Sequence, residues 1–162
     1  FEPDPTAAAT CRENLRAWNV DGQLYECAVT ADGSETLFEP DRADGGRTVT
    51  HSLGRSVIRV PAVRASSVLG GRTDLLKIDI EGAELNVLRE AASMLANVRN
   101  VFVEYHWKCG TKPFLGEILS LLESTGFVCL VQPSLIPTHA FRAEWRRLPG
   151  FVQLVNIFAT RQ

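Results

Sequence analysis

A short apolar segment at residues 75–80 leads through an acidic turn directly into a helix-forming segment. The segment reads Leu-Leu-Lys-Ile-Asp-Ile, which is typical of a buried strand, and Gly82 follows it in the turn. The next segment carries apolar side chains at helical spacing: Leu85, Leu88, Ala92 and Leu95. A strand at residues 98–105 and a helix at residues 113–126 repeat the pattern. Alternating strands and helices need crossover connections, so we predict an α/β fold with a largely parallel sheet and helices on both faces.

The rest of the chain fits this pattern with one interruption. Residues 1–3 are interpreted as the end of a strand, and Asp4 and Pro5 as the cap and first position of a helix. Between residues 35 and 60 two strand candidates flank a polar loop at residues 41–46, so a hairpin-like excursion is expected there. Further strands are predicted at three places: residues 24–29, 127–131 and 151–159.

Composition and charge exclude several classes of function. The chain has 162 residues, of which 45% are hydrophobic and 22% charged, and these values are typical of one globular domain spanning residues 1–162. The formal net charge of −2 offers no electrostatic attraction to nucleic acid or to an anionic membrane. No apolar run approaches the roughly 18–20 residues that cross a bilayer. We therefore expect a soluble cytoplasmic protein that binds neither nucleic acid nor a membrane.

The cysteines give no sign of a metal site. Cys11, Cys27, Cys109 and Cys129 form no Cys-x-x-Cys pair, and no histidine lies at metal-finger spacing from them. No metal is therefore predicted. A chain of this length can bury a core without disulfide bonds, so reduced thiols are expected, although the even number of cysteines leaves disulfides open.

Acidic residues cluster directly after the strand at residues 75–80. Asp79, Glu81 and Glu84 fall within six residues, where they repel one another and where Asp79 is costly to remove from water. Helix capping is the alternative interpretation, but one acid is enough to complement a helix N-terminus. Open α/β sheets bind ligands outside the carboxyl ends of their strands, so the surplus of acids indicates a catalytic or binding role.

Two other predicted strands also end in polar residues. Glu104 and His106 share one side of an extended chain, and a histidine beside a carboxylate can serve as a general base. A surface histidine or a hydrogen-bonded core histidine is the alternative. Glu2 is interpreted as an acceptor for the ribose hydroxyls of a nucleotide-like cofactor, or alternatively as a solvated acid that the following helix favours.

Several segments, taken in order, resemble the FkbM family of S-adenosylmethionine-dependent methyltransferases. The strongest is Lys-Ile-Asp-Ile-Glu-Gly-Ala-Glu at residues 77–84. Shorter segments support it: Phe1-Glu2-Pro3, Asn14-Leu15, Ala28-Val29, Val87-Leu88 and Val103-Glu104-Tyr105-His106. The resemblance spans residues 1–131. It implies a Rossmann-like methyltransferase three-layer sandwich, usually of seven strands with the last inserted antiparallel, and methylation most often of a hydroxyl on a sugar or natural product.

The resemblance also implies roles for single residues. Three of them would bind the cofactor S-adenosylmethionine: Glu2 at the ribose, Ala28 near the adenine, and Asp79. Four would serve methyl transfer: His106, Asp79, Glu81 and Glu104. Among these, His106 is the candidate base, and Asp79 or Glu81 would orient the methyl acceptor.

The sequence departs from the family at the glycine-rich turn after the first strand, where the backbone approaches the methionine part of the cofactor. The pairs Gly45-Gly46 and Gly70-Gly71 lie in the wrong order and context, so this turn is expected upstream of Phe1. We therefore expect a methyltransferase domain whose N-terminal strand is missing. That strand would lie between the strand of Glu2 and the strand at residues 75–80. Open strand edges invite association, so a homo-oligomer is a further expectation.

Two other functions stay open at this point. A nicotinamide-dependent oxidoreductase would also use an acid at Glu2, but it would not need the acids of residues 79–84. A non-catalytic binding or assembly module would keep the methyltransferase fold without its chemistry. The segment Arg-Ala-Glu-Trp-Arg-Arg at residues 142–147 would then contact an anion, a glycan or a partner protein, and a solvated stretch is the alternative.

Overall fold

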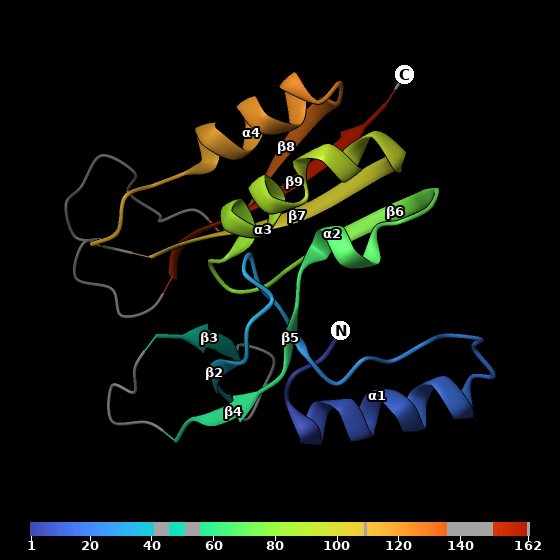
Figure 1. Ribbon diagram of the computed structural model, residues 1–162. Helices are drawn as coiled ribbons and strands as arrows, with labels where there is room; N and C mark the ends of the chain where they lie inside the picture. Colours follow the sequence, from blue (N-terminus) through green and yellow to red (C-terminus); the bar gives the residue numbers. More distant parts are fainter. Residues whose placement is uncertain (41–45, 51–55, 109, 136–150, 162) are drawn as a thin grey trace. The chain divides into compact units, whose positions relative to one another are not determined.

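The computed structural model describes residues 1–40, 46–50, 56–108, 110–135 and 151–161. It is a mixed α/β structure that divides into two compact units, Phe1–Arg64 and Ala65–Gln162 (Figure 1). The polar loop predicted at residues 41–46 lies almost wholly outside the described residues, and so does the segment at residues 142–147.

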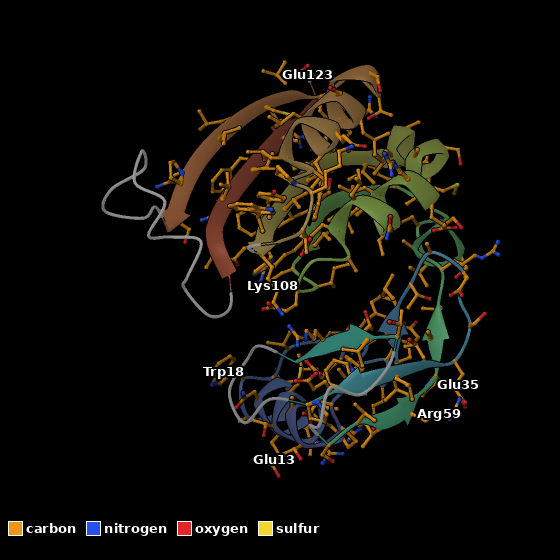
Figure 2. The ribbon with its side chains drawn as sticks, turned by 90° about the vertical axis from the view of Figure 1, so that its left-hand side faces the viewer. Glu13, Trp18, Glu35, Arg59, Lys108 and Glu123 are labelled. Carbon is orange, nitrogen blue, oxygen red and sulfur yellow. The ribbon has the colours of Figure 1, made fainter. Side chains whose placement is uncertain are left out.

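The first unit begins with the predicted helix, α1 (Pro5–Ala17). It starts at this point because the Asp4 carboxylate accepts hydrogen bonds from the backbone N–H groups of Thr6 and Ala7, at 2.8 and 3.3 Å. Pro5 takes the first helical position, where its missing N–H costs nothing. Trp18, labelled in Figure 2, caps the other end and is 74% exposed.

The strands of the first unit form two small sheets. In one, β1 (Ala28–Val29) pairs in parallel with β5 (Ala62–Val63). In the other, β2 (Thr36–Glu39) pairs antiparallel with β3 (Arg47–Val49) and β4 (Ile58–Val60), which confirms the hairpin-like excursion. Their core consists of three buried residues: Ala28, Phe38 and Val60.

Two predictions for this unit need correction. The strand predicted at residues 24–29 is confined to Ala28 and Val29. Residues 1–3 form no strand, because Glu2 makes a single backbone hydrogen bond, from its N–H to the carbonyl of Tyr25 at 2.9 Å, and one bond is not a ladder.

The second unit contains a four-stranded sheet in the order β6-β7-β9-β8. Its strands are β6 (Thr73–Ile78), β7 (Val98–Lys108), β8 (Val128–Leu135) and β9 (Phe151–Thr160). β6 and β7 are parallel, whereas β9 lies between β7 and β8 and is antiparallel to both. The sheet is therefore mixed rather than largely parallel, because the last strand inserts between two strands that share one direction.

Helices cover one face of this sheet in the described part of the unit. They are α2 (Ala65–Val68), α3 (Glu84–Glu90), the 3₁₀-helix η1 (Ala92–Asn97) and α4 (Leu115–Ser124) (Figure 1). Val101, Val103 and Tyr105 alternate along β7 and are buried on the helix-covered face. On the opposite face Phe158 is 42% exposed and Leu75 is 62% exposed. The expected burial of residues 75–80 on both sides, with helices on both faces, is thus not found within this unit.

No helix in the described ranges is both long and apolar enough to cross a membrane. Three cysteines in these ranges, Cys11, Cys27 and Cys129, are free thiols, while Cys109 lies outside them.

Candidate active site

The candidate site lies where β6 and β7 run side by side toward their carboxyl ends. The register pairs Lys77 with Phe102 and Ile78 with Val103, so Asp79 follows β6 on the side of the sheet that carries Glu104. Oxygen atoms of Asp79 and Glu104 and a ring nitrogen of His106 lie within 4.8 Å of one another. The parallel pairing therefore brings together the acids and the histidine that the sequence placed after separate strands.

His106 lies inside β7 rather than beyond its end. The strand was predicted to stop at residue 105, but pairing with β9 extends it to Lys108. The imidazole is only 5% exposed. Its position on a paired strand, rather than on a loop, holds the ring firmly against the turn that follows β6.

That turn has an unusual backbone conformation. Glu81 has φ 57° and Gly82 has φ 103°, so two successive residues lie in the left-handed region. Glycine adopts this conformation freely, but for Glu81 it costs about 1–2 kcal/mol. The Gly82 N–H donates to the Glu84 side chain at 2.8 Å, which closes the turn. The strained backbone places the Glu81 carboxylate 3.6 Å from Nε2 of His106.

Three carboxylates surround the His106 ring. Nδ1 is 3.0 Å from Oε1 of Glu84, and Nε2 is 3.9 Å from Oδ1 of Asp79 and 3.6 Å from Oε1 of Glu81. Burial by itself would lower the pKa of His106. The hydrogen bond that the ring donates to Glu84 and the charges of Glu81, Glu84 and Asp79 outweigh burial, so the pKa is raised.

The carboxyl group of Glu81 is also perturbed. Burial raises its pKa most, and repulsion from Asp79, Glu84 and Glu104 adds to the rise, while His106 opposes it. The Asp79 carboxylate, in contrast, has a positive charge beside it, because the Lys77 ammonium lies 2.9 Å from its Oδ2. Strain, burial and like charge thus meet at Glu81, a combination that is typical of functional sites.

We predict that Glu81→Asn stabilises the fold by about 1 kcal/mol at neutral pH, because asparagine tolerates the left-handed conformation and removes one like charge. Chemical denaturation measures the free energy of unfolding. A raised carboxyl pKa costs stability only above its unfolded-state value, so the gain should shrink in acid. Glu81→Gln, which removes the charge but keeps the strain, should gain less. Equal gains for both variants would contradict the backbone contribution.

The donor set of Asp79, Glu104 and His106 could in principle hold a divalent cation. Two of the three residues already have polar partners, however. Lys77 pairs with Asp79, and Glu84 bonds Nδ1 of His106. These contacts place a paired carboxylate and a hydrogen-bonded imidazole side by side at the ends of β6 and β7.

Two residues of the site carried no individual role in the sequence analysis. Glu84 was counted only as one acid of the cluster, yet it contacts His106 directly. Asn156 on β9 is paired in register with Glu104, and its buried Oδ1 has no hydrogen-bond partner among the described residues. The available signal for Asn156 was an amide within the apolar segment predicted as the last strand.

Glu2 and Ala28, the other predicted cofactor residues, belong to the first unit. One carboxylate oxygen of Glu2 accepts the Asp4 N–H at 2.8 Å. Ala28 is 3% exposed and lies in the core of that unit. Their roles at the ribose and the adenine stay predictions.

Comparison with known proteins adds independent information. The family described as the methyltransferase FkbM domain matches residues 1–129. The chain is 30% identical to Methyltransferase 1 of Beauveria bassiana, with 82% of this chain and 63% of that protein covered. It is 29% identical to the 2-O-methyltransferase NoeI of Sinorhizobium fredii, with coverage of 65% and 51%. It is also 29% identical to the 31-O-demethyl-FK506 methyltransferase FkbM of Streptomyces tacrolimicus, with coverage of 93% and 71%.

The chain thus spans less than two thirds of the length of the first two of these relatives. No solved structure shows significant similarity to it. The family match covers most of the sequence and includes both the acidic turn and His106, so the chain belongs to the FkbM methyltransferase family.

Proposed function

We propose that the whole protein transfers a methyl group from S-adenosylmethionine to a hydroxyl of a small molecule or glycan. One observation carries the proposal: an imidazole with a carboxylate on Nδ1 and two more near Nε2 lies at the carboxyl ends of two parallel strands. Two relatives support the hydroxyl as acceptor, because one is named a 2-O-methyltransferase and the other a 31-O-demethyl-FK506 methyltransferase. The family match gives no support to a nicotinamide-dependent oxidoreductase.

Glu2 is the described residue whose contacts can be compared with what this cofactor needs. Glu2 is half-buried, and the Asp4 N–H fixes one of its carboxylate oxygens. An ionised carboxylate has about four acceptor positions, so Glu2 keeps acceptors for a pair of ribose hydroxyls. Asp79 and Ala28 complete the proposed cofactor contacts. When bound, S-adenosylmethionine supplies a methyl carbon that the positive sulfur has already activated.

The protein then has two tasks, to align the acceptor and to take its proton. Asp79 and Glu81 accept hydrogen bonds from the acceptor molecule, and Nε2 of His106 receives the hydroxyl proton. With S-adenosylmethionine bound, the electrons of that O–H bond would form the new bond from oxygen to carbon, and the carbon–sulfur pair would stay on sulfur. Alignment can contribute about 7–11 kcal/mol to such a reaction, and a general base about 10²–10⁴-fold in rate.

The finer architectural features belong to the same proposal. We expect the intact domain to form the Rossmann-like three-layer sandwich of the family, which the inserted antiparallel strand β9 supports. The free thiols of Cys11, Cys27 and Cys129 suit a cytoplasmic protein. Self-association would follow from an open strand edge.

Calorimetric titration of the full-length protein tests the proposed cofactor. We expect S-adenosylmethionine to bind and NADH not to bind. Incubation with a methyl-labelled cofactor and a panel of hydroxyl-bearing sugars and natural products should then transfer label to oxygen. Binding without transfer to any acceptor would favour the non-catalytic module, and binding of NADH alone would overturn the proposal.

We also predict that methyl transfer survives removal of divalent cations. Lys77 already pairs with Asp79, and His106 is held by Glu84, so the proton acceptor needs no ion. The measurement compares turnover of protein treated with a chelator and of the same protein after Mg²⁺ or Mn²⁺ is restored. A loss of turnover that the cation reverses would show that the acids bind metal instead.

A further inference from the structure

We infer that Glu84 is the positioning residue of this site, because it fixes the proton of neutral His106 on Nδ1 and so presents Nε2 to the acceptor hydroxyl. The inference rests on the proposed role of His106 as the base. It assigns to Glu84 a function distinct from that of the acids beside Nε2, which would contact the acceptor molecule.

The contacts of Glu84 support this role. It is the first residue of α3 and has 0% of its surface exposed. Its Oε1 accepts the Gly82 N–H at 2.8 Å and lies 3.0 Å from Nδ1 of His106. An ionised carboxylate can only accept hydrogen bonds, so Nδ1 must carry the proton in that contact. The neutral ring then has its basic lone pair on Nε2.

The burial of Glu84 argues against a purely structural role. Burial of an acid is costly unless its oxygens find partners. Oε2 of Glu84 is buried and has no hydrogen-bond partner among the described residues. An exposed acid would complement the start of α3 equally well without this cost. The contact that distinguishes Glu84 from such an acid is the hydrogen bond to His106.

The surroundings of Nε2 differ from those of Nδ1. Asp79 and Glu81 lie 3.9 and 3.6 Å from Nε2, beyond normal hydrogen-bond length, so neither of them fixes the tautomer. They are close enough to stabilise the charged ring after it takes a proton. The arrangement follows the logic of a catalytic triad, in which a buried carboxylate orients the histidine and does not itself take the proton.

Nitrogen NMR of the full-length protein labelled at histidine tests the inference. Wild type should show the proton of neutral His106 on Nδ1, and Glu84→Gln should show a mixture of tautomers. Among the described residues, the charged groups that face the ring include Asp79, Glu81, Glu84 and, from its own strand, Glu104. Removal of the Glu84 charge should therefore lower the pKa of His106 and move the acidic limb of the pH–rate profile to lower pH. Turnover should fall several-fold, by less than the about 10²–10⁴-fold that loss of the base itself costs.

Glu90→Gln is a matched control on the same helix. Glu90 ends α3 and accepts a hydrogen bond from the Ser66 N–H at 3.0 Å, so its loss perturbs packing without touching His106. We expect this variant to lose some stability and to keep the wild-type tautomer and pH profile. If Glu84 had only a structural role, Glu84→Gln would likewise keep the wild-type tautomer and pH profile.

The outcomes separate this inference from the proposed function. An Nε2-protonated ring in wild type, or an unchanged tautomer and pKa in Glu84→Gln, would overturn the inference. If that variant does not fold, the wild-type tautomer alone decides. If Glu84 controls the tautomer but turnover does not depend on His106, the positioning role stands and the assignment of the base fails.

Discussion

Replacement of His106 by alanine in the full-length protein should lower turnover by about 10²–10⁴-fold and leave the affinity for S-adenosylmethionine near that of wild type. The Lys77 ammonium is paired with Asp79, so the proposed proton acceptor beside Asp79, Glu81 and Glu104 is the imidazole. Without it, no neutral nitrogen receives the hydroxyl proton. Single-turnover kinetics measures the chemical step, and calorimetry measures cofactor affinity.

His106→Asn separates the loss of the base from damage to the fold. Asparagine can still donate an N–H toward Glu84, but it offers no basic nitrogen. We therefore expect it to be as slow as the alanine variant and more stable. Wild-type turnover in either variant would remove His106 from the role of base.

Leu88→Ala should lower the free energy of unfolding by about 2–5 kcal/mol. Leu88 is 0% exposed and lies on α3, four residues after Glu84. Its truncation removes apolar contacts and leaves a cavity beneath the helix that carries the carboxylate partner of His106. Urea denaturation followed by circular dichroism gives the free energy.

Asn86→Ala is the control, because Asn86 is exposed on the same helix. Its free energy of unfolding should stay within about 0.5 kcal/mol of wild type. A loss below about 1 kcal/mol in Leu88→Ala would mean that α3 is not packed as described, and the position of Glu84 would then lose its support.

The meeting of Asp79, Glu104 and His106 could be predicted from the sequence because it depends on short-range rules. An apolar strand ends before Asp79, residues two apart share a face, and parallel neighbours end at one edge. The role of Glu84 could not be predicted in this way. It depends on the left-handed conformations of Glu81 and Gly82, which turn the start of α3 back toward β7, and spacing alone does not specify them.

Other differences arise from long-range pairing. β9 extends β7 past residue 105 and places Asn156 beside Glu104, and no local pattern encodes a partner that is about fifty residues away in the chain. The exposure of Leu75 has the same origin, because an apolar strand gives no information about which of its faces a helix covers. Sequence patterns thus predicted where strands and helices lie along the chain better than which strands pair and which faces are covered.

Titration of histidine-labelled full-length protein with S-adenosylmethionine, followed by NMR, tests the central claim most directly and needs no knowledge of the acceptor. If the acids after β6 and His106 border the methyl-transfer site, the His106 nitrogen signals shift as the cofactor binds, and Asp79→Asn weakens that binding. The account is contradicted if the His106 signals do not move at saturating cofactor and Asp79→Asn binds the cofactor as tightly as wild type. The methyl donor would then bind elsewhere.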